Sequence, residues 1–408
     1  MPKRVGFLYD RMEERELIRR SIRIGTKDSK KKKRRDVREV LNDIDGHIEI
    51  MQEIVRTRSF HPRTPRKKVI YDPSSEKLRE TYHVPFFPDG LMQIMEAEAM
   101  KDVIMRGMSH WSCAAIPGRG SKRIHKRISS ALRNDPKGTT YGGEADVEGY
   151  YMHIPVANGM AAFERKIKDQ EFLLLLAITV TCTDISLAEA LEQNLNWRDI
   201  VGDRIGILIG LDINQWFANF YLESLDRYIT TLPGVKYMTR HMDNYTLLGP
   251  NKKKLHKAMA LIAEFMQRNL GLTMKGNWQV YRTTFTPAVA KKHRLLDEKK
   301  KRQRKPRMVS AVGFRFSHTH TIMRKRNFLR FTRQCSRVKK KMDAGKDISF
   351  QQAAGLLSRI GQLKHCNSHK IRVKYVDPIG VKNLKEVVRH ESKRRRAAQR
   401  FVHAGGAA

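Results

Sequence analysis

Apolar residues recur three or four positions apart along much of the chain, the spacing that places side chains on one face of a helix. This pattern predicts helices over residues 91–108, 160–195, 216–228 and 255–269. The last of these helices is expected to end near Gly271, because glycine commonly follows the end of a helix. Residues 1–60 and 316–398 are also predicted to be helical, but they carry far more charged residues than the four helices above.

Strand signals interrupt these helices. Short runs of strand-forming residues that are bounded by turn residues predict strands over residues 68–71, 81–84, 140–145 and 235–249. The last segment has the pattern of a β-hairpin with the turn Met242-Asp243-Asn244. Strands that alternate with helices in this way predict an α+β fold whose sheet carries helices on one face.

The net charge of the chain limits the classes of function that fit it. Lys and Arg number 81 against 42 Asp and Glu, which gives a formal net charge of +39. In an enzyme that acts on small molecules, such a charge would only destabilise the folded state through self-repulsion. Bound nucleic acid neutralises the positive charge with its phosphates. A ribosome-like or membrane-surface basic protein is the alternative. The longest apolar run, residues 172–180, is too short to span a bilayer. The first residues of the sequence lack the apolar stretch of a secretory signal. We therefore expect a cytoplasmic protein without a membrane partner.

Cysteine spacing argues against a disulfide framework and against a structural zinc site. The four cysteines lie far apart and none belongs to a CxxC pair. His365, Cys366 and His369 are close in sequence, but no second ligand cluster accompanies them. The sequence gives little support for a metal site there.

Two aspartates have the sequence context of catalytic groups. Asp146 ends the predicted strand 140–145, and Asp243 lies in the predicted hairpin turn. Two such carboxylates at a sheet edge could hold a pair of divalent cations about 3.5–4 Å apart, as phosphoryl-transfer enzymes do. Magnesium suits a site of few carboxylates completed by substrate phosphates. The alternative is that Asp243 only satisfies backbone groups of its turn.

Seven motifs in a fixed order resemble those of bacterial and phage reverse transcriptases, particularly the branch found in diversity-generating retroelements. The resemblance covers residues from about 77 to 316. The motifs are RETYHVPFFPD (79–89), CAAIPGRGSKRIHKRI (113–128), ADVEGYYMHI (145–154), IGLDINQWFANFYLESLDRYI (209–229), YMTRHMDNYTLLG (237–249), LTMKGNWQV (272–280) and VGFRF (312–316).

This resemblance implies a right-hand polymerase with an α+β fold and a helical, basic thumb. Its parts would be a basic helical N-terminal extension (1–60), fingers (61–139), palm (140–316, with a basic insertion at 291–308), thumb (317–400) and a disordered tail (401–408). The implied activity is RNA-directed DNA polymerisation in a phage or diversity-generating retroelement. It implies an RNA template, a DNA primer, deoxynucleoside triphosphates and a small basic accessory protein as partners, and magnesium, with manganese as an alternative, as cofactor.

The resemblance assigns the chemistry to a few positions. Asp146 and Asp243 would bind the metals, and Val147 would offer its backbone carbonyl to one of them. Asn244 stands where the family has a second aspartate in the hairpin. Lys275 would act as general acid, or as electrostatic partner, for the pyrophosphate leaving group.

Other positions are implied to bind substrate. Tyr151 would crowd a ribose 2′-hydroxyl, although a core tyrosine is the alternative. Gly210 and Gln215 would line the pocket of the incoming nucleotide and template base. Arg79 and Arg119 are candidates for triphosphate or template contacts, since guanidinium groups bind phosphate in a bidentate fork; surface solvation is the alternative.

The sequence departs from the family pattern in the hairpin and in two loops. His241 replaces a tyrosine, Asn244 an aspartate, Asn214 a serine and Gly90 an arginine. The loss of negative charge predicts weaker metal binding. These changes support one alternative, a degenerate polymerase fold that serves as an RNA-binding module. The same motifs would also permit a second alternative, a template-independent antiphage polymerase.

Two basic stretches are expected to contact nucleic acid. Residues 291–307 are nearly all charged, which predicts an exposed loop that grips template RNA. Cations at the start of the thumb could follow the backbone of a duplex, or could be merely solvated: Arg324, Lys325, Arg326, Arg330 and Arg333.

Overall fold

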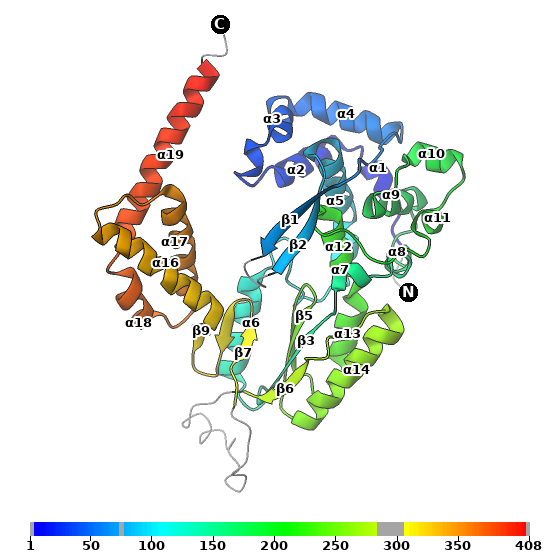
Figure 1. The fold of residues 1–408 in the computed structure, drawn as a ribbon. Helices are drawn as coiled ribbons and strands as arrows, with labels where there is room; N and C mark the ends of the chain where they lie inside the picture. Colours follow the sequence, from blue (N-terminus) through cyan, green and yellow to red (C-terminus); the bar gives the residue numbers. More distant parts are fainter. Residues whose placement is uncertain (1–3, 73–76, 284–305, 405–408) are drawn as a thin grey trace. The chain divides into compact units, whose positions relative to one another are not determined.

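The computed structural model describes residues 4–72, 77–283 and 306–404, with side chains as far as residue 394 (Figure 1). The chain divides into two compact units. Residues 1–123 and 143–280 form the first unit, and residues 124–142 and 281–408 form the second. Both contain helices and antiparallel strands, which confirms the predicted mixture of helix and sheet.

The first residues are helical, as predicted. They form α1 (Leu8–Arg11), α2 (Arg15–Gly25), α3 (Arg35–Asn42) and α4 (Ile44–Arg56). Asp43 caps α4 by accepting a hydrogen bond from the Gly46 backbone N–H at 2.9 Å. The cationic run after α2 is a short 3₁₀ turn, Lys31–Lys33, with no buried residue.

A two-stranded ribbon follows, formed by β1 (Arg66–Asp72) and β2 (Lys77–His83). The strands pair antiparallel, with Arg66 opposite His83. The strands predicted at 68–71 and 81–84 are therefore confirmed, the second with an earlier boundary. The ribbon is fastened to the rest of the unit at its base, where the Tyr82 backbone N–H donates to the Ile209 carbonyl at 2.7 Å.

The core of the first unit is built on two buried helices, α5 (Leu91–Met105) and α9 (Gln170–Thr181). The predicted helix at 91–108 is confirmed, but its pattern suggested one buried face. In the structure, polar Gln93, Glu96 and Glu98 are buried with the apolar residues, because α2 and α12 (Asp212–Tyr221) also pack against α5. None of the helices in the described part of the chain has the length and apolar character needed to cross a bilayer.

The sheet that carries the candidate site has the strand order β4-β5-β3-β6. Its strands are β3 (Tyr141–Asp146), β4 (Tyr237–His241), β5 (Asn244–Gly249) and β6 (Gln279–Arg282). Helix α14 (Lys252–Leu270) packs against β5 and ends at Gly271, whose φ is 60°. The predicted strand before Asp146, the hairpin and the end of α14 are confirmed.

The remaining helices of this unit correct one prediction. They are α7 (Tyr150–His153), α8 (Val156–Glu164), α10 (Leu187–Glu192), α11 (Trp197–Val201), α12 and α13 (Glu223–Thr231). Residues 216–228 were expected to form one helix, but α12 ends at Tyr221 and α13 begins at Glu223. Leu222 leaves helical geometry (φ −87°, ψ 4°) without glycine or proline, so no sequence signal marks the break.

The second unit combines a small sheet with helices. Strands β7 (Val309–Ala311), β8 (Phe314–Phe316) and β9 (Thr321–Met323) pair antiparallel in that order. Most of α6 (Ser121–Asn134) belongs to this unit, with α16 (Lys325–Asp343), α17 (Phe350–Gln362), α18 (His369–Ile371) and α19 (Val381–Ala404). Phe331, Leu356, Val376 and Leu384 form part of its core.

Two predictions concern the ends of this region. Residues 316–398 were predicted to be helical, and β9 corrects this at their start, because residues 321–323 complete the sheet beside β8. The predicted basic insertion at 291–308 falls almost entirely outside the described residues, which resume at 306. Helix α19 continues to Ala404, and the rest of the predicted tail, residues 405–408, is also outside them.

Candidate active site

Asp146 and Asp243 come together at one end of the sheet. Asp146 is the last residue of β3, and Asp243 lies in the two-residue loop that joins β4 to β5. Strand β5 neighbours β3 in the sheet, and the charge of Asp146 acts on the carboxyl group of Asp243. Burial, and after it the negative charge of Asp146, raise the pKa of Asp243 to about 6. The two carboxylates are therefore close enough to repel each other.

The loop that carries Asp243 is tight. His241 pairs with Asn244 at the end of the ladder, which leaves only Met242 and Asp243 between the strands. Met242 has a positive φ of 59°, in a region that favours glycine and costs other residues energy. Two-residue hairpins need such a conformation in at least one loop residue. A methionine held in this conformation indicates that the surroundings impose the loop geometry.

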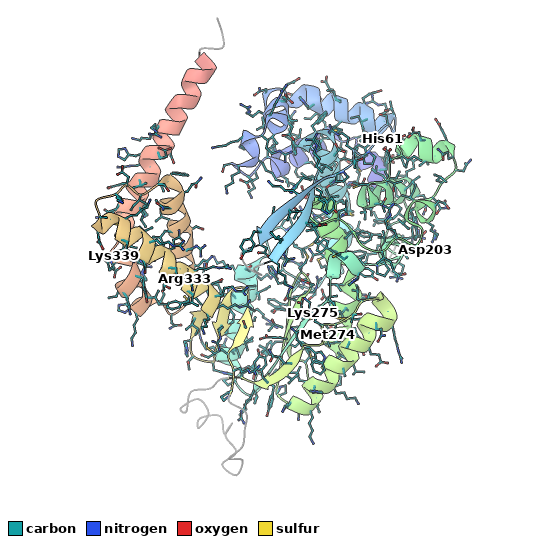
Figure 2. All side chains as sticks on the ribbon, in the orientation of Figure 1. His61, Asp203, Met274, Lys275, Arg333 and Lys339 are labelled. Carbon is teal, nitrogen blue, oxygen red and sulfur yellow. The ribbon has the colours of Figure 1, made fainter. Side chains whose placement is uncertain are left out.

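Lys275 is the cationic partner of Asp146. Its ammonium group forms an ion pair with Asp146 Oδ2, and its backbone N–H donates to the Asp146 carbonyl at 2.9 Å. Figure 2 labels Lys275 beside Met274 in the segment that precedes β6. The other carboxylate oxygen, Asp146 Oδ1, is buried and has no hydrogen-bond partner among the described residues. One oxygen of the site is thus left for another ligand.

The backbone of Val147 is positioned by its pairing with the segment before β6. It faces Met274 in an isolated antiparallel bridge. The bonds of that bridge flank Val147, because Lys275 N donates to Asp146 O and Glu148 N donates to Thr273 O at 2.8 Å. In this pairing the N–H and C=O of the central residue point away from the partner strand. The Val147 carbonyl is therefore directed to the side opposite Met274.

Asn244 modifies the site rather than supplying a charge. Its side-chain Nδ2 donates a hydrogen bond to Asp243 Oδ1 at 3.0 Å, in an exposed position. In the part of the chain that the structure describes, no three His, Cys, Asp or Glu side chains gather in the manner of a metal site. A cation here would depend on two carboxylates, a carbonyl and oxygens of the substrate. That donor set fits magnesium, which commonly binds one or two carboxylates together with phosphates.

Among the predicted substrate residues, Tyr151 lies at the site. Its hydroxyl contacts the Met242 sulfur at 3.9 Å, and burial, with the negative charge of Asp243, raises the pKa of its phenol. Gly210 instead adjoins the β1–β2 ribbon, where an added Cβ would lie 2.5 Å from the Tyr82 carbonyl oxygen. Gln215 is half-buried on α12.

The two predicted arginines are engaged by the protein. Arg79 forms an ion pair with Asp72 across the ribbon at 2.9 Å. Arg119 donates through Nη1 to the carbonyls of Ser109 and Ser112, at 2.6 and 3.3 Å. Arg119 thereby stabilises the loop that pairs with β4 through Ser112, which is a structural role that the sequence did not indicate.

The sequence reasoning missed a buried ion pair beneath the loop. Arg240 of β4 and Asp226 of α13 have side-chain exposures of 0% and 1%, and their closest N–O distance is 2.7 Å. Arg240 also donates to the Met242 carbonyl at 2.9 Å. A signal existed, because Asp226 falls among apolar residues of a helix and Arg240 at an inward-facing strand position. Two opposite charges with apolar neighbours on the same face of their elements favour a buried pair.

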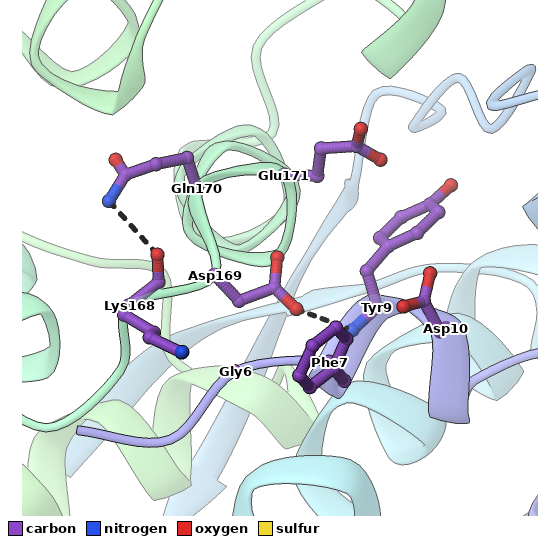
Figure 3. A pocket seen from close by; sticks show the side chains of 8 residues that line it. All are labelled: Gly6, Phe7, Tyr9, Asp10, Lys168, Asp169, Gln170 and Glu171. Atoms are coloured by element: carbon purple, nitrogen blue, oxygen red, sulfur yellow. Dashed lines mark hydrogen bonds between the residues drawn. The ribbon is translucent and has the colours of Figure 1, made fainter. Parts of the chain in front are cut away.

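A separate pocket of about 300 Å³ lies near the N-terminus, between the start of α1 and the start of α9 (Figure 3). Its carboxylate Asp169 is already engaged on both oxygens. One accepts from the Tyr9 backbone N–H at 2.9 Å, and the other caps α9 at the Phe172 N–H at 3.0 Å. These bonds join the N-terminal segment to the core helix, so Asp169 has a structural role in the pocket.

Comparison with known proteins gives limited similarity. No family model matches the chain. A segment of 196 residues is 28% identical to the uncharacterized 91 kDa protein in cob intron of Schizosaccharomyces pombe. The match covers 46% of this chain and 22% of that protein, so it spans about a fifth of the relative's length.

Among solved structures, the telomerase of Candida albicans, determined in complex with the TWJ fragment of telomeric RNA, aligns with a TM-score of 0.40 and 9% identity. The alignment covers 76% of this chain and 54% of the telomerase chain. At this level the likeness carries no argument about function. The chain is thus similar in part to an intron-encoded protein and, weakly in structure, to a telomerase.

Proposed function

We propose that the chain is an RNA-directed DNA polymerase that joins deoxynucleotides at Asp146 and Asp243. The observation that carries this proposal is the convergence of the two carboxylates from a strand end and a hairpin loop. Burial, and after it the negative charge of Asp146, raise the pKa of Asp243, which disfavours the ionised pair in the absence of a cation. Such an arrangement is typical of functional sites, where a bound cation offsets the repulsion.

The residues present fit a magnesium site. Asp146, Asp243 and the Val147 carbonyl would hold the cations, and the unpartnered Asp146 Oδ1 supports this assignment. When bound, a pair of divalent cations supplies charge stabilisation to the attacking and leaving oxygens of the transfer. In that reaction the primer 3′-oxygen forms a bond to the α-phosphorus, and the bond from that phosphorus to the pyrophosphate oxygen breaks.

The surrounding residues have distinct tasks in this proposal. Lys275, already beside Asp146, would move its ammonium group to the pyrophosphate and stabilise the charge that develops there. Tyr151, in contact with Met242, would form the wall that leaves no room for a ribose 2′-hydroxyl. The site would then select deoxynucleotides by shape.

The basic surface of α16 supports a duplex partner. Arg326, Arg333, Arg337 and Lys340 are exposed and recur three, four or seven residues apart, on the side of the helix opposite buried Phe331. Figure 2 labels Arg333 on this helix. Such a row of cations suits a phosphate backbone, and an RNA–DNA hybrid is recognised by shape rather than by base sequence. A retroelement context and a small basic accessory protein belong to the proposal through the sequence resemblance alone.

Primer extension on an RNA template tests the proposal. Purified protein is given a DNA primer, deoxynucleotides and magnesium or manganese, beside Asp146→Ala and Asp243→Ala. The exposed carboxylate of Glu148, two residues after Asp146, provides the matched control Glu148→Ala. We expect synthesis by the wild type and by the control, and its loss in both aspartate variants. Equal synthesis by all four proteins would contradict the proposal.

A second candidate is a polymerase fold that binds RNA without catalysis. Two observations favour it. The Asn244 amide bonds to Asp243, and the Lys275 ammonium group bonds to Asp146, so both carboxylates have protein partners. This candidate predicts RNA binding that is unchanged by Asp146→Ala, with no incorporation in either metal. The extension assay, run beside an RNA-binding titration, distinguishes the two functions.

A further inference from the structure

Arg240 is the largest fully buried side chain of the described residues. Removing a guanidinium group from water costs several kcal/mol, so a buried arginine persists only where its donors are satisfied. Asp226 supplies the opposite charge, and Tyr245 donates its hydroxyl to Asp226 Oδ1 at 3.1 Å. Since the side chain cannot reach solvent, its task lies inside the protein.

The hydrogen bonds of Arg240 use the whole guanidinium fork. Nε donates to both oxygens of Asp226, at 2.8 and 3.0 Å. Nη2 donates to Asp226 Oδ2 at 2.7 Å and to the Asn219 carbonyl at 3.0 Å. Nη1 donates to Asn219 Oδ1 at 3.3 Å and to the Met242 carbonyl at 2.9 Å. The five N–H groups of an arginine therefore all have acceptors, and one of these acceptors belongs to the loop of the site.

The bond to Met242 acts on Asp243 directly. The Met242 carbonyl and the Asp243 N–H belong to one planar peptide group, so fixing the carbonyl fixes the plane from which the Asp243 side chain projects. The loop has no ladder pair of its own beyond His241 and Asn244, and Met242 is held at a positive φ. A buried donor aimed at this carbonyl supplies the constraint that the loop conformation requires.

The same arginine is anchored through its backbone. Its N–H donates to the Trp111 carbonyl at 2.9 Å, and its carbonyl accepts from the Cys113 N–H at 3.0 Å. Asn219, which receives two of the guanidinium bonds, donates to the Ala114 carbonyl at 2.9 Å. Both ends of Arg240 are therefore tied to the segment 111–114, and the guanidinium group has little freedom to follow a displaced loop.

From these contacts we infer that Arg240 is a positioning residue that holds the Met242–Asp243 peptide so that Asp243 faces Asp146. This inference rests on the proposed function, because it assigns Arg240 a task in that site. A lysine in its place would keep the positive charge beside Asp226, but one ammonium group cannot reach Asp226, Asn219 and Met242 at once. The loop would then lose its support while the buried charge stayed paired.

The test compares Arg240→Lys with Tyr245→Phe. The second variant removes a hydroxyl bond from the same buried network but leaves the Arg240 bond to Met242 intact. Both are first examined by circular dichroism and thermal melting. Manganese affinity is then measured by electron paramagnetic resonance, and single-nucleotide incorporation is measured against manganese and deoxynucleotide concentration.

We expect Arg240→Lys to weaken manganese binding and lower kcat by about 10–100-fold, the usual effect of a misplaced catalytic group, with little change in KM for the nucleotide. Tyr245→Phe should lower the melting temperature but leave the manganese dependence unchanged. Equal changes in both variants, or no change in Arg240→Lys, would overturn the inference. If Arg240→Lys does not fold, the double variant Arg240→Gln with Asp226→Asn replaces it, because removing both charges leaves no unpaired buried charge. Tyr245→Phe remains its control.

The outcomes separate this inference from the proposed function. A wild type that binds manganese through Asp146 and Asp243 but does not extend a primer overturns the polymerase proposal. The effect of Arg240→Lys on manganese affinity still decides the inference in that case. A wild type that binds no manganese at these aspartates overturns both.

Discussion

Glu96 provides a prediction that depends only on the fold. Its side chain lies on the core helix α5, is 0% exposed, and has no hydrogen-bond partner for either carboxyl oxygen among the described residues. Burial raises its pKa well above the ordinary value of 4.5, and the nearby Thr179 hydroxyl offsets this only in part. We therefore expect Glu96 to keep its proton to a higher pH in the folded protein than in the unfolded chain, and Glu96→Gln to mimic the protonated state without a titrating group.

The sign of the pH effect follows from linkage. In the unfolded chain Glu96 ionises near pH 4.5, whereas in the folded protein it keeps its proton to a higher pH. Unfolding therefore releases a proton between these two values, and the stability of the wild type falls as the pH rises. A single group contributes a slope of at most about 1.4 kcal/mol per pH unit, so the stability of Glu96→Gln should increase relative to that of the wild type as the pH rises above the unfolded-state pKa.

Urea denaturation at several pH values measures this difference. The matched control is Glu98→Gln, two residues along the same helix. Glu98 is also buried, but it pairs with Arg20 and Lys101, each at 3.0 Å. Its replacement should destabilise the protein at neutral pH, the opposite sign, because it removes the negative charge that pairs with two cations. A difference in stability between Glu96→Gln and the wild type that does not change with pH, or that changes in the opposite direction, would refute the reasoning.

Four further outcomes follow from the site and the fold. Asn244→Asp should lower the magnesium concentration for half-maximal primer extension by about tenfold, since it adds a carboxylate beside the site. Tyr151→Ala should increase incorporation of ribonucleotides relative to deoxynucleotides, which a competition assay measures. Gly210→Ala should lower the free energy of unfolding, measured by urea denaturation, by about 1–3 kcal/mol, because Gly210 has a φ of 112° and lies close to a carbonyl oxygen of the ribbon. Gly276→Ala, where an added Cβ meets nothing within 4 Å, should change it by less than about 0.5 kcal/mol. Replacing Arg333 and the other exposed cations of α16 by alanine should flatten the salt dependence of duplex binding, with the logarithmic slope falling by about one for each phosphate that is no longer neutralised.

The local elements were predictable because short-range chemistry determines them. The strand before Asp146 and the hairpin around Asp243 follow from alternation and turn residues, and the end of α14 from Gly271. The order of the strands then brings together the two aspartates that the sequence motifs singled out. The roles assigned to those residues remain predictions.

The features that could not be predicted from the sequence depend on tertiary contacts. The break at Leu222 carries no glycine or proline, and it exists where α13 turns Asp226 toward Arg240. Arg119 looked like a phosphate ligand because its chemistry suits phosphate, yet the same donors suit the carbonyls of its own loop. The pattern of α5 suggested one buried face, but partners on several sides bury its polar residues as well.

The proposed polymerase requires that Asp146 and Asp243 jointly hold the cations of a nucleotidyl transfer. Anomalous diffraction from crystals of the protein with manganese, an RNA–DNA primer–template and a non-hydrolysable deoxynucleotide tests this requirement without relying on turnover. We predict two manganese peaks about 3.5–4 Å apart, between the carboxylates of Asp146 and Asp243 and the nucleotide phosphates. Manganese bound elsewhere, with Lys275 still on Asp146 and the nucleotide away from both aspartates, would contradict the proposal.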